Sequence, residues 1–135
     1  MIELYFDGYC ETNPGVFGGY GVVIKKDNEI IKTISQTFTG ENISNNVAEY
    51  KGLFAGLDYL LAEGLQDNDV SIYGDSMLVI NQMSGTWRIK KGLYKNIAKQ
   101  TKELVKKFSN IEFSWIPREQ NTEADSLSRP ESRPK

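Results

Sequence analysis

The chain contains no histidine and only one cysteine, Cys10, among its 135 residues. Without histidine, neither a Cys–His nucleophile nor a histidine-based general acid–base pair is available. A single cysteine cannot form an internal disulfide, so we expect a structural role for Cys10 and a reducing, cytoplasmic setting. No apolar stretch approaches the length of a membrane span, and Met1 leads into a strand pattern instead of a basic and then apolar signal.

Length and composition favour one globular domain. The chain is 39% hydrophobic and 25% charged, which is ordinary for a globular protein of this size. We expect the domain to cover residues 1–128 and to act as a monomer. Residues 129–135 are polar and interrupted by proline, so we expect a disordered tail there.

Alternating apolar residues and turn signals predict five strands and four helices. The strands are expected over residues 1–8, 18–26, 29–39, 69–75 and 111–116, with Asp7-Gly8 ending the first. The helices are expected over residues 45–63, 76–84, 93–108 and 121–128, with Asn45 or Asn46 capping the first. This order predicts an α/β fold in which a five-stranded mixed sheet carries helices on both faces.

Four acidic residues lie at the ends or edges of these elements: Asp7, Glu49, Asp75 and Asp125. Taken singly, each has a structural explanation, because Asp-Gly is a common turn and the other three fit helix caps. Taken together, strands that end at one edge of a sheet, beside a helix start, would bring all four into one crevice. Such a cluster is costly to ionise unless a divalent metal neutralises it. The four residues therefore indicate metal-dependent phosphoryl-transfer chemistry.

Positive charge is concentrated in one segment. The net charge is −2, yet residues 88–107 hold eight of the sixteen lysines and arginines and one acidic residue, Glu103. A solvated helix face would explain this distribution. A surface that contacts phosphates beside an acidic metal site would explain it as well.

Four motifs give the chain its resemblance to a known family. They are Asp7-Gly8 through Asn13-Pro14-Gly15 and Gly18-Gly19-Tyr20-Gly21; Asn45-Asn46-x-x-Glu49; Asp75-Ser76 followed by Trp87; and Trp115-Ile116-Pro117-Arg118 through Asp125. Each motif alone is weak, but the four in this order and spacing are specific. Over residues 1 to about 128 the chain resembles type 1 ribonuclease H, in the short archaeal and bacterial form without a long basic protrusion.

The resemblance implies a ribonuclease H-like fold and a metal-dependent endoribonuclease. Such an enzyme hydrolyses the RNA strand of RNA–DNA hybrids and leaves 5′-phosphate and 3′-hydroxyl ends. Two divalent ions, Mg²⁺ or Mn²⁺, would be held by Asp7, Glu49, Asp75 and Asp125. Carboxylate oxygens are the ligands that such hard cations prefer.

The resemblance also suggests which residues contact the hybrid. They are Asn13, Ser44, Asn45, Asn46, Asn81, Trp87, Arg88, Lys90 and Lys91. A wide, shallow minor groove and 2′-hydroxyls are features by which an RNA-containing duplex is read. The asparagines would serve equally well as caps and turn formers, and Trp87 would serve equally well in the core.

The chain departs from the family pattern near its end. Many members carry a histidine in the loop before the last aspartate, and here Arg118 is the candidate substitute. In place of a long basic protrusion the chain has only the short stretch Arg88-Ile89-Lys90-Lys91-Gly92, which predicts weak, salt-sensitive hybrid binding. Cleavage of double-stranded RNA is a further expectation to test. Two alternatives are a DNA-cutting or strand-transfer nuclease of the same fold and a non-catalytic nucleic-acid-binding module.

Overall fold

The computed structural model describes residues 1–11 and 15–129. Asn13 and residues 130–135 of the expected tail therefore lie outside the described residues. In chain order the elements are β1 (Ile2–Cys10), β2 (Gly15–Lys26), β3 (Glu29–Ile43), α1 (Asn45–Ala62), β4 (Asp69–Gly74), α2 (Met77–Met83), α3 (Lys95–Val105), β5 (Asn110–Trp115), a 3₁₀ turn η1 (Arg118–Gln120) and α4 (Thr122–Ser128).

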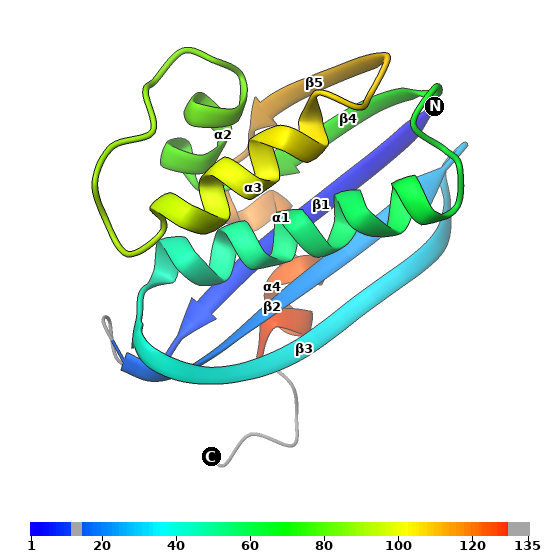
Figure 1. Cartoon of the computed structure of the whole chain (residues 1–135). Helices are drawn as coiled ribbons and strands as arrows, with labels where there is room; N and C mark the ends of the chain where they lie inside the picture. Colours follow the sequence, from blue (N-terminus) through cyan, green and yellow to red (C-terminus); the bar gives the residue numbers. More distant parts are fainter. Residues whose placement is uncertain (12–14, 130–135) are drawn as a thin grey trace.

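The strands form one mixed sheet in the order β3-β2-β1-β4-β5. The pairs β1–β2 and β2–β3 are antiparallel, whereas β1–β4 and β4–β5 are parallel. Helices α1 and α3 lie across one face of the sheet and α4 lies behind it, on the other face (Figure 1). The predicted α/β class, with five strands and helices on both faces, is confirmed.

The main core lies between the sheet and α1. Ile2, Leu4 and Phe6 alternate along β1 and have no solvent exposure. They belong to one cluster with Leu53 and Leu57, which are one helical turn apart on α1. Apolar residues at every second position of β1 thus pack against apolar residues at helical spacing on α1, as the sequence pattern predicted. None of the helices that the structure describes has the length and apolar character needed to cross a membrane.

The first strand does not end at Asp7-Gly8, so that prediction was wrong. β1 continues to Cys10, and Asp7 and Gly8 pair with Gly21 and Tyr20 of β2. The long β2 strand keeps the antiparallel ladder intact past the point where a turn was expected. The Cys10 thiol is buried and donates to the Ile43 carbonyl oxygen, in line with its predicted structural role.

Two helix starts also differ from the prediction. Ser44, and not Asn45 or Asn46, is the N-cap of α1, and its Oγ accepts the Val47 N–H at 3.1 Å. Serine is among the best N-cap residues because its short side chain reaches these free amides. Helix α3 begins at Lys95, two residues after the expected Leu93.

Two glycines allow α1 and α4 to approach the β1–β2 ribbon closely. A Cβ atom on Gly8 would lie 2.2 Å from the backbone nitrogen of Glu49 in α1. A Cβ atom on Gly21, the cross-strand partner of Asp7, would lie 2.3 Å from the carbonyl oxygen of Ala124 in α4. Main-chain contact therefore sets the distance of α1 and of α4 from the β1–β2 ribbon, and a side chain at either glycine would increase that distance.

We expect Gly8→Ala to destabilise the protein by about 2 kcal/mol or more, because overpacking forces backbone shifts. The obstructing atoms belong to backbone, so they cannot move aside as a flexible side chain would. Urea unfolding measures the change. Gly40→Ala is the matched control, because its Cβ would meet nothing closer than 3.7 Å. Equal unfolding midpoints for the two variants would contradict this account of Gly8.

Candidate active site

The parallel pairing of β1 and β4 aligns two of the predicted acidic residues. Tyr5 pairs with Tyr73, and β4 ends one residue later at Gly74. Continued by two residues, this register sets Asp7 opposite Asp75. Both carboxylates thus stand at the carboxyl end of the parallel strands, the edge at which α/β sheets bind ligands.

The structure brings all four predicted carboxylates together. Oxygen atoms of Asp7, Glu49 and Asp75 lie within 4.8 Å of one another. Asp125 lies close enough for its charge to act on both Asp7 and Asp75. Helix α1 brings Glu49 to the cluster, and α4, on the opposite face of the sheet, brings Asp125.

The cluster is buried and strongly coupled. Asp7 is 5% exposed and Glu49 is 8% exposed. Burial, the neighbouring Asp125 carboxyl and repulsion from Asp75 raise the pKa of Asp7 from 3.8 to about 8. Burial and repulsion from Asp7 and Asp75 raise the pKa of Glu49 well above its ordinary value. Burial also raises the pKa of Asp75, although the charge of Arg118 opposes this shift. Without a cation, the raised pKa of Asp7 therefore favours its protonated form at neutral pH.

The donor set fits divalent metal. Glu49 Oε2 and Asp75 Oδ2 are buried side-chain oxygens with no hydrogen-bond partner among the described residues. Buried polar atoms are nearly always satisfied, so such oxygens point to a ligand. Their carboxylate chemistry suits Mg²⁺ or Mn²⁺, and the described part of the cluster offers no thiolate or imidazole.

Two arginines lie at the border of the cluster. Arg118 Nε is 3.9 Å from Asp75 Oδ2, but the Arg118 side chain is 79% exposed. Arg129 Nε is 3.6 Å from Asp125 Oδ1, and its guanidinium lies over the Tyr9 ring at 4.3 Å. Arg129, the first residue of the expected tail, thus contacts the site.

Sequence reasoning missed the role of Asn121. It was expected to open the last helix, and it does precede α4, but its side chain makes no cap hydrogen bond. Asn121 is 1% exposed, and its Nδ2 donates to the Phe6 carbonyl oxygen at 2.9 Å. This bond ties the start of α4 to β1 directly before Asp7. A buried asparagine cannot be told from a capping one by local pattern.

The expected substrate contacts on α1 and α2 also have local roles. Besides the Ser44 cap, Asn45 Oδ1 accepts the Cys10 N–H at 3.1 Å and so joins α1 to the end of β1. Asn46 is partly exposed at the start of α1. Asn81 Nδ2 donates to the Met77 carbonyl oxygen at 2.8 Å within α2.

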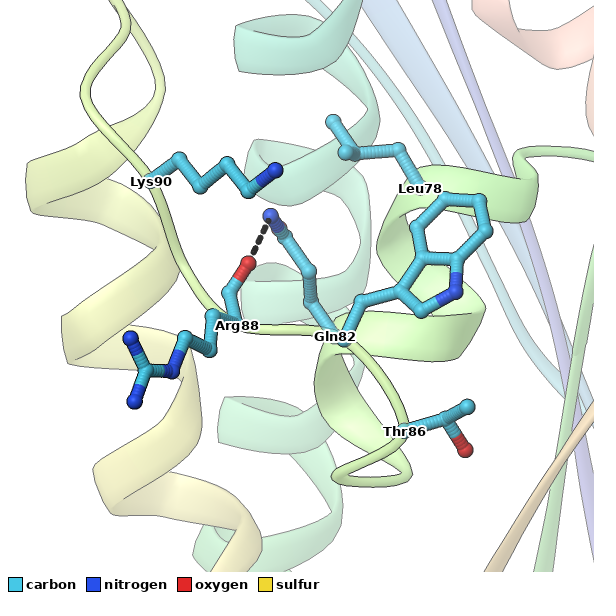
Figure 2. Close-up of a pocket in the computed structure, with 6 residues that line it drawn as sticks. Leu78, Gln82, Thr86, Arg88 and Lys90 are labelled. Atoms are coloured by element: carbon cyan, nitrogen blue, oxygen red, sulfur yellow. Dashed lines mark hydrogen bonds between the residues drawn. The ribbon is translucent and has the colours of Figure 1, made fainter.

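Trp87, Arg88 and Lys90 line a hollow of about 480 Å³ beside α2. Leu78, Gln82 and Thr86 complete its lining (Figure 2). Trp87 is 45% exposed, so the alternative that placed it in the core was wrong. Lys91, the next residue of the basic segment, is exposed as well.

Comparison with known proteins gives consistent family matches. The model of a family described as reverse transcriptase-like matches residues 5–130. The chain is 38% identical over 122 residues to the bifunctional protein Rv2228c of Mycobacterium tuberculosis, covering 90% of this chain and 33% of that protein. It is 30% identical over 127 residues to ribonuclease HI of Halobacterium salinarum, covering 94% and 62%. The chain therefore spans about a third of the first relative and less than two thirds of the second.

A solved structure supports the same assignment. LC11-RNase H1, determined in complex with an RNA/DNA hybrid, superposes with a TM-score of 0.82 at 32% identity. The match covers 94% of this chain and 93% of that one. Sequence motifs, sheet order, the carboxylate cluster and these comparisons agree, and the chain belongs to the type 1 ribonuclease H family.

Proposed function

We propose that this chain is an endoribonuclease that hydrolyses the RNA strand of RNA–DNA hybrids with two divalent ions. The observation that carries the proposal is the cluster of Asp7, Glu49 and Asp75, in which Glu49 Oε2 and Asp75 Oδ2 have no hydrogen-bond partner among the described residues. The family's ribonuclease names and the hybrid bound to LC11-RNase H1 indicate the substrate class.

The chain's own residues supply ligands and position. Asp7, Glu49, Asp75 and Asp125 would hold the ions. When bound, Mg²⁺ or Mn²⁺ would activate water and stabilise the leaving 3′-oxygen, giving 5′-phosphate and 3′-hydroxyl ends. Arg118, exposed beside Asp75, takes the place of the loop histidine that many members carry and can approach a phosphate without leaving the cluster's border.

The basic segment, defined here as residues 87–91, supplies the hybrid contacts. Trp87 offers an exposed aromatic face for a deoxyribose, and Arg88, Lys90 and Lys91 offer charge to phosphates. Ser44, Asn45, Asn46 and Asn81 form a second group of proposed contacts, together with Asn13 outside the described residues. Phosphate contacts weaken as the salt concentration rises, and their small number here predicts weak binding of the hybrid.

The test is strand-specific cleavage. A hybrid labelled on either the RNA or the DNA strand is incubated with protein and Mg²⁺, Mn²⁺ or chelator. We expect metal-dependent cutting of RNA only, with phosphate at the 5′ ends of the products. Cutting of DNA would instead identify a DNA nuclease, and binding without cutting a non-catalytic module. Double-stranded RNA in parallel measures how strictly the hybrid is selected.

A further inference from the structure

Gln82 of α2 is an uncharged polar side chain in the core. It is 1% exposed, and burying an amide is costly unless its hydrogen bonds are satisfied. Gln82 Oε1 accepts the Tyr50 hydroxyl at 2.5 Å. Gln82 Nε2 donates to the Arg88 carbonyl oxygen at 3.0 Å and to the Tyr94 hydroxyl at 3.2 Å. Both amide hydrogens are therefore used within the protein, so Gln82 has none to donate to a ligand in the hollow.

These hydrogen bonds join three parts of the chain. Tyr50 follows Glu49 on α1, Tyr94 is the N-cap of α3, and Arg88 belongs to the basic segment between α2 and α3. Figure 2 shows the Gln82 side chain reaching the Arg88 main chain at the hollow. The Tyr50 and Tyr94 rings also stack at 5.9 Å between centroids, and both hydroxyls bond the Gln82 amide.

The basic segment is mostly exposed and has few contacts that hold its backbone. It forms no helix and no strand, and Trp87, Arg88, Lys90 and Lys91 are exposed. The Trp87 N–H donates to the Asn81 carbonyl oxygen at 2.9 Å, and Ile89 is partly buried against the core. Lys102 Nζ holds the end of α2 by donating to the Gln82 carbonyl oxygen at 3.0 Å. The Gln82 amide thus links the segment to the same helix that carries Glu49.

We infer that Gln82 is a positioning residue for substrate binding: through Arg88 it holds the basic segment in the shape that meets the DNA strand of a hybrid. The inference rests on the proposed function. Gln82 does not touch substrate. It fixes the distance between the exposed groups of the segment and α1, so that hybrid bound by the segment is in register with the carboxylates.

The principal test is Gln82→Met, which keeps length and apolar volume and removes all three side-chain hydrogen bonds. We expect KM for hybrid to rise about tenfold, since each lost hydrogen bond contributes of the order of a factor of a few. We expect kcat to stay within about twofold, because the carboxylate cluster is unchanged. An unchanged KM, or a fall in kcat without a rise in KM, would overturn the inference.

A second measurement needs no substrate. The chain has two tryptophans, so the ¹⁵N–¹H heteronuclear NOE of each indole can be followed separately. We expect Gln82→Met to lower the NOE of Trp87 and to leave that of Trp115 unchanged, since Trp115 Nε1 is held by the Asp75 carbonyl oxygen. An unchanged NOE for Trp87, or an equal fall in the NOE of both indoles, would refute a local positioning role.

A milder variant keeps the inference testable if Gln82→Met does not fold. Tyr94→Phe removes one hydrogen bond and keeps the stacked ring, so KM should rise by about two- to threefold and the Trp87 NOE should fall slightly. No change in either would overturn the inference. Failure of the wild-type protein to cut hybrid would instead overturn the proposed function, while the NOE comparison would still decide whether Gln82 holds the segment.

Discussion

Replacing Asp7 with asparagine is expected to reduce hybrid hydrolysis at least about 10³-fold. Asp7 is the central carboxylate, close to Glu49 and Asp75 and within range of the charge of Asp125. An amide keeps the shape but loses the charge that binds metal, and a metal ion contributes several kcal/mol to the transition state, of which about 4 kcal/mol corresponds to this factor. Initial rates on labelled hybrid in Mg²⁺ measure the loss.

The same substitution should stabilise the metal-free protein. Burial and repulsion raise the pKa of Asp7 to about 8, so folding at neutral pH requires this group either to take up a proton or to remain charged in an unfavourable place. Asparagine is neutral without a proton. We expect a gain of at least about 1.4 kcal/mol, the equivalent of one pKa unit, and a Tm higher by roughly 3–5 °C in EDTA.

Asp58→Asn is the matched control, because Asp58 is exposed on the same helix as Glu49. It removes one negative charge without touching the cluster, and both activity and Tm should stay near wild type. An Asp7→Asn variant that kept full activity would refute the metal assignment. One that lost activity together with stability would show that Asp7 supports the fold and not only the chemistry.

The second large effect is a fall in stability with rising pH in the metal-free protein, which bound metal is expected to oppose. The pKa of Asp7 is about 8 in the folded protein and near 3.8 in an unfolded chain. Between these values the unfolded chain has lost the proton and the folded protein still binds it. Stability therefore falls as pH rises from about 4 to about 8. The raised pKa values of Glu49 and Asp75 act in the same direction.

Thermal unfolding at pH 5.5, 7.0 and 8.5, at constant ionic strength, checks this dependence. In EDTA we expect Tm to fall across the series, and in Mg²⁺ we expect the stabilisation by metal to grow with pH, because the ion binds the deprotonated carboxylates. Asp7→Asn should flatten the slope in EDTA. A Tm that rises with pH in EDTA would contradict the proposed coupling within the cluster.

The local sequence pattern predicted the helices and strands well because buried apolar residues recur at every second position in a strand and at every third or fourth position in a helix. Ile2, Leu4 and Phe6 on β1 and the apolar stripe of α1 needed no tertiary information. Their order along the chain, with the family motifs, was sufficient for the sheet class and for the four carboxylates. The error at Asp7-Gly8 shows the limit of such patterns: the dipeptide has the composition of a turn, yet β2 pairs with it as strand.

What the sequence could not provide depends on contacts between distant segments. Asn121 and Gln82 have ordinary local patterns, and their roles depend on contacts with Phe6 and Tyr50, which are far from them in the sequence. The exposure of Trp87 depends likewise on how residues 84–94 leave α2. Gly8 and Gly21 belong to the motifs, but their purpose appears only when α1 and α4 are seen on opposite faces (Figure 1).

The close contacts at Gly8 and Gly21 make the arrangement of the carboxylates partly independent of how the core is packed. Main chain meeting main chain determines how far Glu49 and Asp125 stand from Asp7. We therefore expect exchanges of core residues that keep these main-chain contacts to change heat resistance while the arrangement of the carboxylates stays constant. An engineer could likewise alter heat resistance through the core without retuning the chemistry.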